Sequence, residues 1–438
     1  MSDRSLFQKV FNSAEIGFSL RAISIIDRGI TGSAILLGLE AIITFGIFGG
    51  VGYALAGTLA MIILAPLAKK IKSDLPNGQT ISDYFQLKLP DLGYWVMIFY
   101  LIMTTVSILC MQIVAGGMMV YAIFDIPSSI GMFLTYIFCI LLSCLRRSEL
   151  LTKLTLARVF FIFTVAFILP LYFFLREGAE HIYKGIRLYH PYLLVTDNKD
   201  VLYFFVLSFL IVLGKAIMDS KLWQYILVLD KRESSHTFVL SGVIWGTLPL
   251  SFSSLVLIVI FTGGFQNINT IYYDLLHGFD STFLLSLFVI GAFSAISSTF
   301  VIEFDTLTKL WKMNLVPRLS GYAEQKMSKA GNYIAVFISG IALCLSIYLN
   351  LSLLNAFFYF GILFVSVLLP MIVIICSKEK VSNLITLSVL VCTTLGFILL
   401  QNFGYMKGLF ICALTSTLLN FSILVSTSLL KNRKEKYK

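Results

Sequence analysis

Long apolar stretches alternate with short polar links along the chain. Each stretch has about twenty residues rich in Leu, Ile, Phe and Val, the length an α-helix needs to cross the hydrocarbon core of a bilayer. The pattern predicts about twelve membrane-spanning helices, at residues 31–50, 52–68, 93–123, 128–145, 154–175, 201–228, 237–262, 281–308, 331–350, 353–376, 382–400 and 407–430. The links are too short to hold a soluble domain.

The composition supports an all-α polytopic protein embedded in lipid. Of the 438 residues, 58% are hydrophobic and only 13% are charged. A soluble protein of this size needs polar side chains over most of its exterior, whereas a chain surrounded by lipid does not. The net charge of +10 is spread in short clusters between the apolar stretches. We therefore expect the lipid bilayer, and no nucleic acid, as a partner.

Basic residues are concentrated after the even-numbered spans. Lys69, Lys70 and Lys72 follow the second span, and the tail KNRKEKYK follows the twelfth. The link after the fifth span, which is also basic, is the exception. Because cytoplasmic loops carry an excess of Lys and Arg, we expect a multi-pass protein of the cytoplasmic (inner) membrane with both termini in the cytoplasm. The N-terminal segment lacks the compact apolar core of a signal peptide.

No catalytic or metal-cluster motif accompanies the spans. The seven cysteines lie within or at the edges of apolar stretches without a CxxC pair, which predicts free buried thiols. The four histidines, His181, His190, His236 and His277, lie in links or at span ends. We therefore expect no catalytic residues, no cofactor other than a coupling ion, and no enzymatic activity. An obligate protein partner is not expected either.

Four ionisable residues are candidates for a position near the bilayer centre: Glu40 in the first span, Lys215 and Asp219 in the sixth, and Glu303 in the eighth. Such residues are costly in lipid, so they generally face a protein interior or a wet cavity. Lys215 and Asp219 are four residues apart and share one face of a continuous helix. They either neutralise each other or belong to a solute or coupling site, in which Lys215 also faces Glu40.

The eighth span carries the segment GAFSAISSTFVIEFD. Ala295, Ser298 and Thr299 project from one face of this helix. Two hydroxyls beside the carbonyl of a small residue supply neutral oxygen ligands, which suit a hard monovalent cation. Ser and Thr in membrane helices more often bond to the preceding turn or pack against neighbours, so both interpretations stay open from spacing alone.

Four stretches make the chain resemble the sodium:solute symporter family. FGGVGYALAG (48–57) is similar to the junction of the family's first two core helices, and KKIKSDLPNGQTISDYFQLKLP (69–90) to the loop that follows. LWQYILVLDKRE (222–233) resembles the end of the sixth core helix, and SAISSTFVIEFDTLTKLW (294–311) resembles the eighth. Each motif departs from the family pattern. Tyr225, for example, replaces the usual arginine.

The resemblance implies a LeuT-type fold with two inverted repeats of five helices. In this fold the first and sixth helices are interrupted near the midplane, where unwound backbone coordinates ion and solute. The implied parts are a cytoplasmic N-terminal segment (1–30), the first repeat (31–175), the second repeat (201–377), two peripheral helices (381–430) and a basic cytoplasmic tail (431–438).

The resemblance also implies a sodium site between the first and eighth spans. Counting back without gaps from Tyr53 places its first-span carbonyls, and aligning AISST places the rest, which gives Leu37, Glu40, Ala295, Ser298 and Thr299. A shift of one residue would move the eighth-span ligands to Ser294, Ser297 and Ser298. Glu40 would then lie at the helix break, as a charged ligand, a proton acceptor or the partner of Lys215.

These observations favour a secondary active transporter that imports a small polar solute together with sodium by alternating access. A proton-coupled carrier of the same fold, in which Glu40 or Glu303 titrates, is the first alternative. A transporter-like membrane sensor or receptor is the second. The solute and coupling residues are expected to include Glu40, Lys215 and Asp219, and the ammonium of Lys215 favours a solute that bears a carboxylate.

Overall fold

The computed structural model describes residues 18–76, 78, 80–144, 148–195, 199–228, 234–260, 271–279, 281–316 and 330–436, and within these ranges the regular structure is entirely helical. The first half of the chain forms α2 (Phe18–Gly29), α3 (Gly32–Phe45), α4 (Ile47–Asp74), α5 (Ile81–Lys88), α6 (Asp91–Phe124), α7 (Ser128–Cys144), α8 (Ser148–Glu177), α9 (Ala179–Tyr189) and the short η1 (Pro191–Leu194). The second half forms α10 (Lys199–Ile217), α11 (Ser220–Val228), α12 (Ser234–Ile260), α13 (Ile271–His277), α14 (Thr282–Leu310), η3 (Trp311–Leu315), α17 (Gly331–Leu349), α18 (Leu353–Cys376), α19 (Asn383–Phe403) and α20 (Tyr405–Lys436).

The long helices correspond to the predicted spans. In the described chain ten helices are long and apolar enough to cross a membrane, and two shorter apolar helices, α3 and α7, accompany them. These twelve helices coincide in order with the twelve apolar stretches. The prediction of an all-α polytopic membrane protein is therefore confirmed. The division into two inverted repeats stays a prediction.

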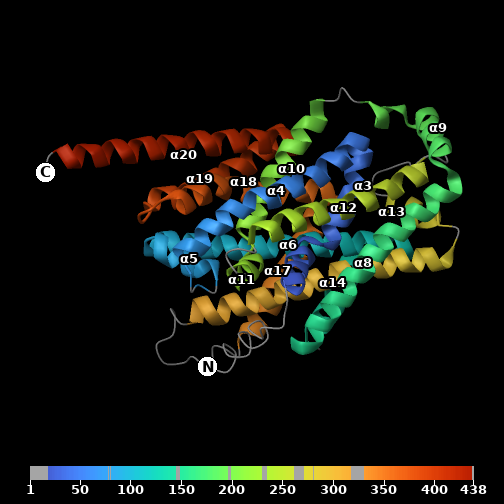
Figure 1. Ribbon diagram of the computed structural model, residues 1–438, viewed down its shortest axis with the longest axis horizontal. Coiled ribbons are helices and arrows are strands. Elements are labelled where there is room, and N and C mark those ends of the chain that lie inside the picture. The colour runs from blue at the N-terminus through green and yellow to red at the C-terminus, as the bar shows by residue number, and fades with distance from the viewer. Residues whose placement is uncertain are drawn as a thin grey trace.

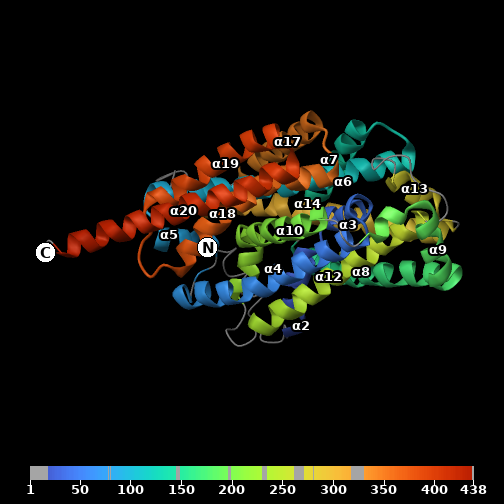
Figure 2. The same cartoon turned by 90° about the horizontal axis from the view of Figure 1, so that it is seen from above.

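The helices run roughly along the long axis of the molecule (Figure 1). The short helices α9 and α13 lie at one end, and α5 lies at the opposite end, in both Figure 1 and Figure 2. We call these the α13 end and the α5 end. α4 packs against α10 and α12, while α18 packs against α10, α19 and α20.

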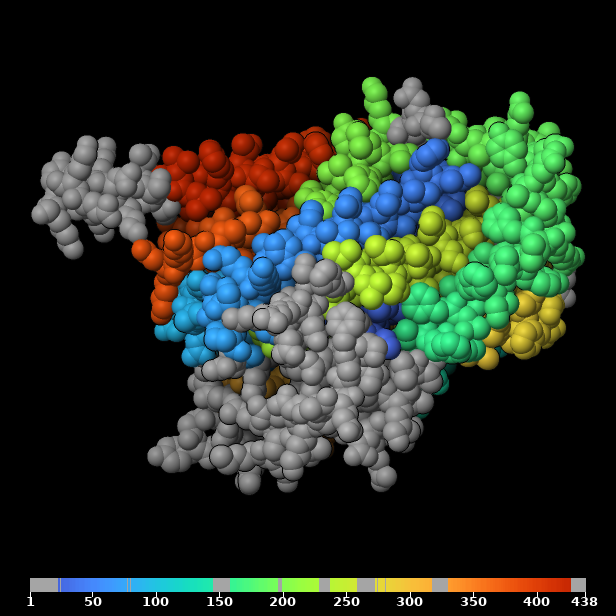
Figure 3. All heavy atoms as spheres, viewed as in Figure 1, coloured from blue at the N-terminus to red at the C-terminus, as the bar shows by residue number. Residues whose placement is uncertain are grey.

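The outer surface is apolar, as expected for contact with lipid. Figure 3 shows the face formed by α4, α12 and α8. On α4, Leu55, Leu59 and Ile63 are 51%, 40% and 42% exposed. Apolar side chains repeated along the outside of a long helix suit the acyl chains of a bilayer, where they need no burial against protein.

The first span is interrupted between α2 and α3. α2 ends at Gly29, and Ile30 and Thr31 are not helical. Thr31 is extended, and its hydroxyl accepts a hydrogen bond from the backbone N–H of Ala34 at 3.1 Å. Thr is a good N-cap because its side chain satisfies an amide that the first turn leaves free. A local capping signal thus restarts the helix after the break.

The sixth span is interrupted in the same manner. α10 ends at Ile217 and α11 begins at Ser220. Between them the carboxylate of Asp219 accepts a hydrogen bond from the backbone N–H of Leu222 at 2.9 Å. Asp219 is therefore the capping residue of α11 and does not share a continuous helical face with Lys215. The two predicted interruptions are present, in the first and sixth spans.

The start of the first span is a correction to the sequence analysis. The predicted boundary at residue 31 separates α2 from α3, although α2 packs against α8, α11 and α12 within the bundle. The twenty-residue criterion missed α2 because this helix is short and carries Asp27 and Arg28. At the other end, Gly46, with a φ of 77°, separates α3 from α4. Residues 1–17 and 437–438 of the predicted N-terminal segment and tail lie outside the described chain.

Candidate functional site

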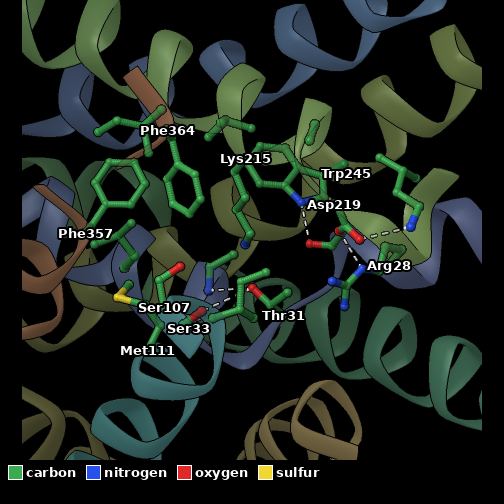
Figure 4. A pocket seen from close by; sticks show the side chains of 18 of the residues that line it. Arg28, Thr31, Ser33, Ser107, Met111, Lys215, Asp219, Trp245, Phe357 and Phe364 are labelled. Carbon is green, nitrogen blue, oxygen red and sulfur yellow. Dashed lines mark hydrogen bonds and ion pairs between the residues drawn. The ribbon is translucent and has the colours of Figure 1, made fainter. Parts of the chain in front are cut away.

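A cavity lies between the two helix breaks. Four groups of elements line it: the first span, α4 and α6, the sixth span, and α12 with α18. Figure 4 shows that it has a polar side and an apolar side. Residues of both interrupted spans, among them Thr31 and Lys215, contribute to the wall. A site formed where two helices are unwound can present both side chains and free backbone groups to a ligand.

Lys215 lies on the cavity wall near the end of α10. Its side chain is partly exposed although the helix is in the middle of an apolar span, and in Figure 4 it extends into the cavity toward Ser33. No carboxylate of the described chain lies within 4.0 Å of its ammonium group. Lys215 is therefore a cationic residue within a membrane span that faces a cavity and forms no ion pair with the described residues.

Hydroxyl groups face this part of the cavity. Thr31, Ser33 and Ser107 all line it. The buried amide of Gln112, on α6, donates to the Ser33 hydroxyl at 2.7 Å, and its oxygen accepts from the Ser33 backbone N–H at 3.2 Å. This pair of bonds holds the first turn of α3 against α6. The polar side of the cavity is therefore fixed by bonds between helices.

Aromatic side chains form the apolar side. Phe357, Phe360 and Phe364 project from α18, and Tyr53 and Trp245 from α4 and α12. The Tyr53 ring packs edge-on against Phe357 and Trp245, with ring centroids 5.9 and 5.7 Å apart. The indole N–H of Trp245 donates to the carbonyl oxygen of Gly29 at 2.5 Å. This bond ties the apolar wall to the first break.

A charged cluster joins the two breaks to α14. Arg28 donates to the Asp219 carboxylate at 2.6 Å and also forms an ion pair with Glu303. Next to it, Arg158 of α8 forms an ion pair with Asp27. All five side chains are buried. Ion pairs make such charges tolerable in a poorly solvated interior, because each would be far more costly alone.

The oxygen-rich segment of α14 lies beside the first break. A Cβ atom added to Gly32 would lie 2.8 Å from the backbone nitrogen of Ile296, so α3 begins in close contact with α14. The Thr299 hydroxyl donates to the carbonyl of Ala295 at 2.9 Å. Ala295 and Thr299 are buried and Ser298 is partly exposed. The segment of α14 that holds Ala295, Ser298 and Thr299 therefore contacts the start of α3 through Ile296.

Leu37 and Glu40 do not lie at the break. Both are in continuous turns of α3, where backbone carbonyls point along the axis toward the next turn. Gap-free counting from Tyr53 placed them there because it assumed that the first break is closer to α4. The carbonyl oxygens that flank the observed break belong to Arg28 and Ile30, and neither accepts a hydrogen bond from the described residues.

Glu40 is fully buried and contacts neutral groups. Its carboxylate accepts a hydrogen bond from the backbone N–H of Leu354, at the start of α18, at 2.7 Å. The Tyr272 hydroxyl of α13 lies 3.1 Å from the same carboxylate. Lys215 is not among the described partners of Glu40. The structure therefore separates two residues that the sequence analysis considered as a pair.

Three charged residues of the cluster escaped the sequence analysis: Asp27, Arg28 and Arg158. Asp27 and Arg28 fall in the segment 1–30 that was expected to be cytoplasmic, and Arg158 lies near the N-terminal end of the predicted fifth span (154–175) and was not among the residues singled out. A weak signal exists in the sequence: Ile25, Ile26 and Ile30 flank the charged pair. In the structure all three isoleucines are buried, as expected for a helix packed in the interior.

Known proteins that are similar to parts or most of this chain include transporters. No family model matches the chain. A segment of 74 residues is 34% identical to the probable urea active transporter 2 of Schizosaccharomyces pombe (strain 972 / ATCC 24843), and it covers 17% of this chain and 11% of that protein. The relative is thus matched over a small part of its length only.

Solved structures resemble the whole chain at low sequence identity. A Na+-coupled sialic acid symporter in a substrate-bound, outward-open state has a TM-score of 0.66 and 13% identity, over 93% of this chain and 90% of that chain. A mutant of the manganese transporter of Eremococcus coleocola has a TM-score of 0.54 and 13% identity, over 94% of each chain. The fold expected from the resemblance is confirmed. The chain is a multi-pass membrane protein with the fold of these proteins.

Proposed function

We propose that the chain is a secondary active transporter of the sodium:solute symporter type, which carries a small polar solute with sodium by alternating access. The solute occupies the cavity between the two helix breaks. The observation that carries this proposal is the close contact between Gly32, at the first break, and Ile296, in the segment of α14 that holds Ala295, Ser298 and Thr299. We also propose that the α5 end, which carries the basic residues after α4, faces the cytoplasm of the cell.

The proposed sodium site combines backbone and hydroxyl oxygens. The carbonyls of Arg28 and Ile30 on the break and of Ala295 on α14, with the hydroxyls of Ser298 and Thr299, supply neutral hard ligands. The Thr299 hydroxyl donates to the Ala295 carbonyl and keeps its own lone pairs for a cation. Sodium that bridges the break and α14 would then stabilise one arrangement of the first span.

Purified protein in detergent provides the first test. Sodium chloride should raise its apparent melting temperature more than potassium or choline chloride at equal ionic strength, because a ligand of the folded state stabilises that state. Ser298→Ala and Thr299→Ala should each reduce the sodium effect. Ser286→Ala is the matched control, because this exposed serine lies on the same helix and bonds only to Thr282.

Two outcomes would contradict the sodium site. An equal response to sodium, potassium and choline would remove sodium as the coupling ion. Loss of the sodium effect in Ser294→Ala and Ser297→Ala, with none in Thr299→Ala, would support the register that is shifted by one residue. Sialic acid and urea, named for the neighbour and the relative, are the first solutes to test for sodium-driven uptake in proteoliposomes.

Proton coupling is the second candidate, and one observation favours it. Glu303 is fully buried, and one of its carboxylate oxygens has no hydrogen-bond partner among the described residues. A proton on that oxygen would break no existing hydrogen bond and would remove a negative charge from the interior. Uptake driven by a pH gradient without sodium, and its loss in Glu303→Gln, would favour this candidate over sodium.

A further inference from the structure

We infer that the solute is an amphipathic monocarboxylate, with its carboxylate bound to Lys215 and its apolar part against the phenylalanines of α18. The inference rests on the proposed function, since it assumes that the cavity between the breaks is the solute site. It goes further by naming the charge and the polarity of the molecule that the cavity accepts.

The charges around the cavity are balanced before a solute enters. Arg28 is shared by two carboxylates, those of Asp219 and Glu303, and this group carries one net negative charge. Lys215 supplies the positive charge that offsets it. The neighbouring pair of Arg158 and Asp27 is neutral by itself. A cavity with no net charge can persist in a membrane interior at moderate cost.

Lys215 is the group that remains available to a solute. Both sides of the Arg28 guanidinium are already engaged by carboxylates, whereas the Lys215 ammonium faces the cavity. A carboxylate is the complementary group, and it can also accept a hydrogen bond from the hydroxyl of Ser33 on the same side, whereas the Ser107 hydroxyl already donates to the Thr104 carbonyl at 2.7 Å. A cationic amine would be repelled by Lys215. A dicarboxylate would have no second free cation in the described wall.

A monocarboxylate also gives the coupled cation a physical role. Its binding would leave the cavity with one net negative charge, and one sodium ion at the α14 oxygens would restore neutrality. Each ligand would therefore raise the affinity for the other by the same factor. The loaded cavity would then be as neutral as the empty one.

The apolar wall defines the rest of the solute. Phe357, Phe360 and Phe364 of α18 line the cavity together with Tyr53 and Trp245, and in Figure 4 Phe357 and Phe364 lie on one side of the Lys215 side chain. A wholly polar solute would leave these rings in contact with water or with polar groups. An aryl or short alkyl group would displace that water and bury apolar surface on both sides. The solute thus has one charged end and one apolar end.

Binding in detergent without any gradient tests the inference separately from transport. The probes are phenylacetate, hexanoate and their neutral amides. Phenethylamine, a cation, and succinate, a dicarboxylate, are the controls that are expected not to bind. The apparent melting temperature and calorimetric titration should both detect the monocarboxylates, and their affinity should exceed that of the amides by about tenfold or more, because a charged hydrogen bond is lost in the amide.

Variants locate the carboxylate. Lys215→Met should abolish the preference for carboxylate over amide, and Lys215→Arg should retain it. Lys407→Met is the matched control, because this exposed lysine lies on α20 and does not line the cavity. Size-exclusion chromatography establishes whether each variant is folded. If Lys215→Met is unfolded, the comparison of Lys215→Arg with the unaltered protein still tests the assignment.

Phe360→Ala tests the apolar end, since it should weaken phenylacetate more than acetate. The inference is overturned if no monocarboxylate binds better than its amide, or if folded Lys215→Met retains the preference. Binding of monocarboxylates without sodium-driven uptake would overturn the proposed coupling and leave the solute class intact. Sodium-driven uptake of a neutral or cationic solute, without uptake of any monocarboxylate, would overturn the solute class and leave the proposed coupling intact.

Discussion

Two buried glutamates in this protein are stabilised in different ways. Glu303 lies at the helix breaks, where it forms an ion pair with Arg28 within a group of charged side chains. Glu40 lies near the start of α18, where its described partners are the N–H of Leu354 and the hydroxyl of Tyr272. Both are fully buried. The first depends on opposite charge, and the second depends on neutral donors.

This difference indicates how each region responds to change. A charge held by another charge is exposed to a large penalty when its partner is removed, because an unpaired ion remains in a poorly solvated place. A carboxylate held by an amide and a hydroxyl loses about one ordinary hydrogen bond per donor removed. The region at the breaks should therefore be sensitive to charge, and the region around Glu40 should be sensitive to the loss of an acceptor.

The largest effect is expected for Arg28→Met. The variant leaves Asp219 and Glu303 without their cation, so it should destabilise the protein by about 3–5 kcal/mol. Thermal unfolding in detergent would detect this as a fall in apparent melting temperature. Arg176→Met is the control, because the Arg176 side chain is 43% exposed at the end of α8 and its surface ion pair contributes about 1 kcal/mol or less.

The same region offers a compensation test. Arg28→Met combined with Glu303→Gln removes one of the two carboxylates that Arg28 served, so the double variant should be more stable than Arg28→Met alone. If the two losses simply add, Arg28 and Glu303 are not coupled, and the comparison between the two regions fails at its first step.

A smaller effect, on ligand linkage, is expected for Glu303→Gln. The variant removes one negative charge near the cavity, so a bound monocarboxylate no longer leaves a net charge that sodium must offset. The ratio of phenylacetate affinities with and without sodium should therefore move toward one. Calorimetric titration measures that ratio, with Glu180→Gln on the exposed side of α9 as the control. An unchanged ratio would show that Glu303 does not contribute to the charge balance.

The sequence predicted that charged residues lie in the interior but not which of them form ion pairs with one another. Lys215, Asp219 and Glu303 stood out because ionisable residues inside apolar stretches are rare. Their partner Arg28 did not, because it lies in a short helix that fails the length criterion for a span. The contacts join residues separated by 191 and 275 positions. Such pairings depend on the packing of three helices and leave no local trace in one sequence.

The positions of the helix breaks illustrate the same limit. That the first and sixth spans are interrupted followed from the resemblance, but the residues did not. The first break is set by Gly29 and the capping side chain of Thr31, which are local signals near the N-terminal side of the apolar stretch. Counting from Tyr53 with a family spacing ignored these signals and assigned the break to Leu37 and Glu40, which lie inside a helix.

The next prediction concerns the acceptor role of Glu40. Glu40→Ala leaves the N–H of Leu354 without its acceptor and should cost about 1–3 kcal/mol. Glu40→Gln retains an oxygen at that place and should cost less, and sodium affinity should be unchanged because Glu40 is distant from the break. The two variants are compared by thermal unfolding and by sodium-induced stabilisation. Lower sodium affinity in Glu40→Gln would restore Glu40 as a ligand.

The smallest effect is expected for Tyr272→Phe. The variant keeps the buried ring and removes only the hydroxyl, which lies 3.1 Å from both the Glu40 carboxylate and the Leu36 carbonyl oxygen of α3, so the cost should be about 1 kcal/mol. Because this hydroxyl joins α13 to α3, hydrogen exchange in α13 should accelerate more than elsewhere. Tyr273→Phe is the matched control on the same helix, since the Tyr273 ring stacks on His277 and its hydroxyl has no hydrogen bond in the described chain. Equal exchange in the two variants would mean that α13 is held by packing alone and that neither Glu40 nor the Leu36 carbonyl anchors it through the Tyr272 hydroxyl.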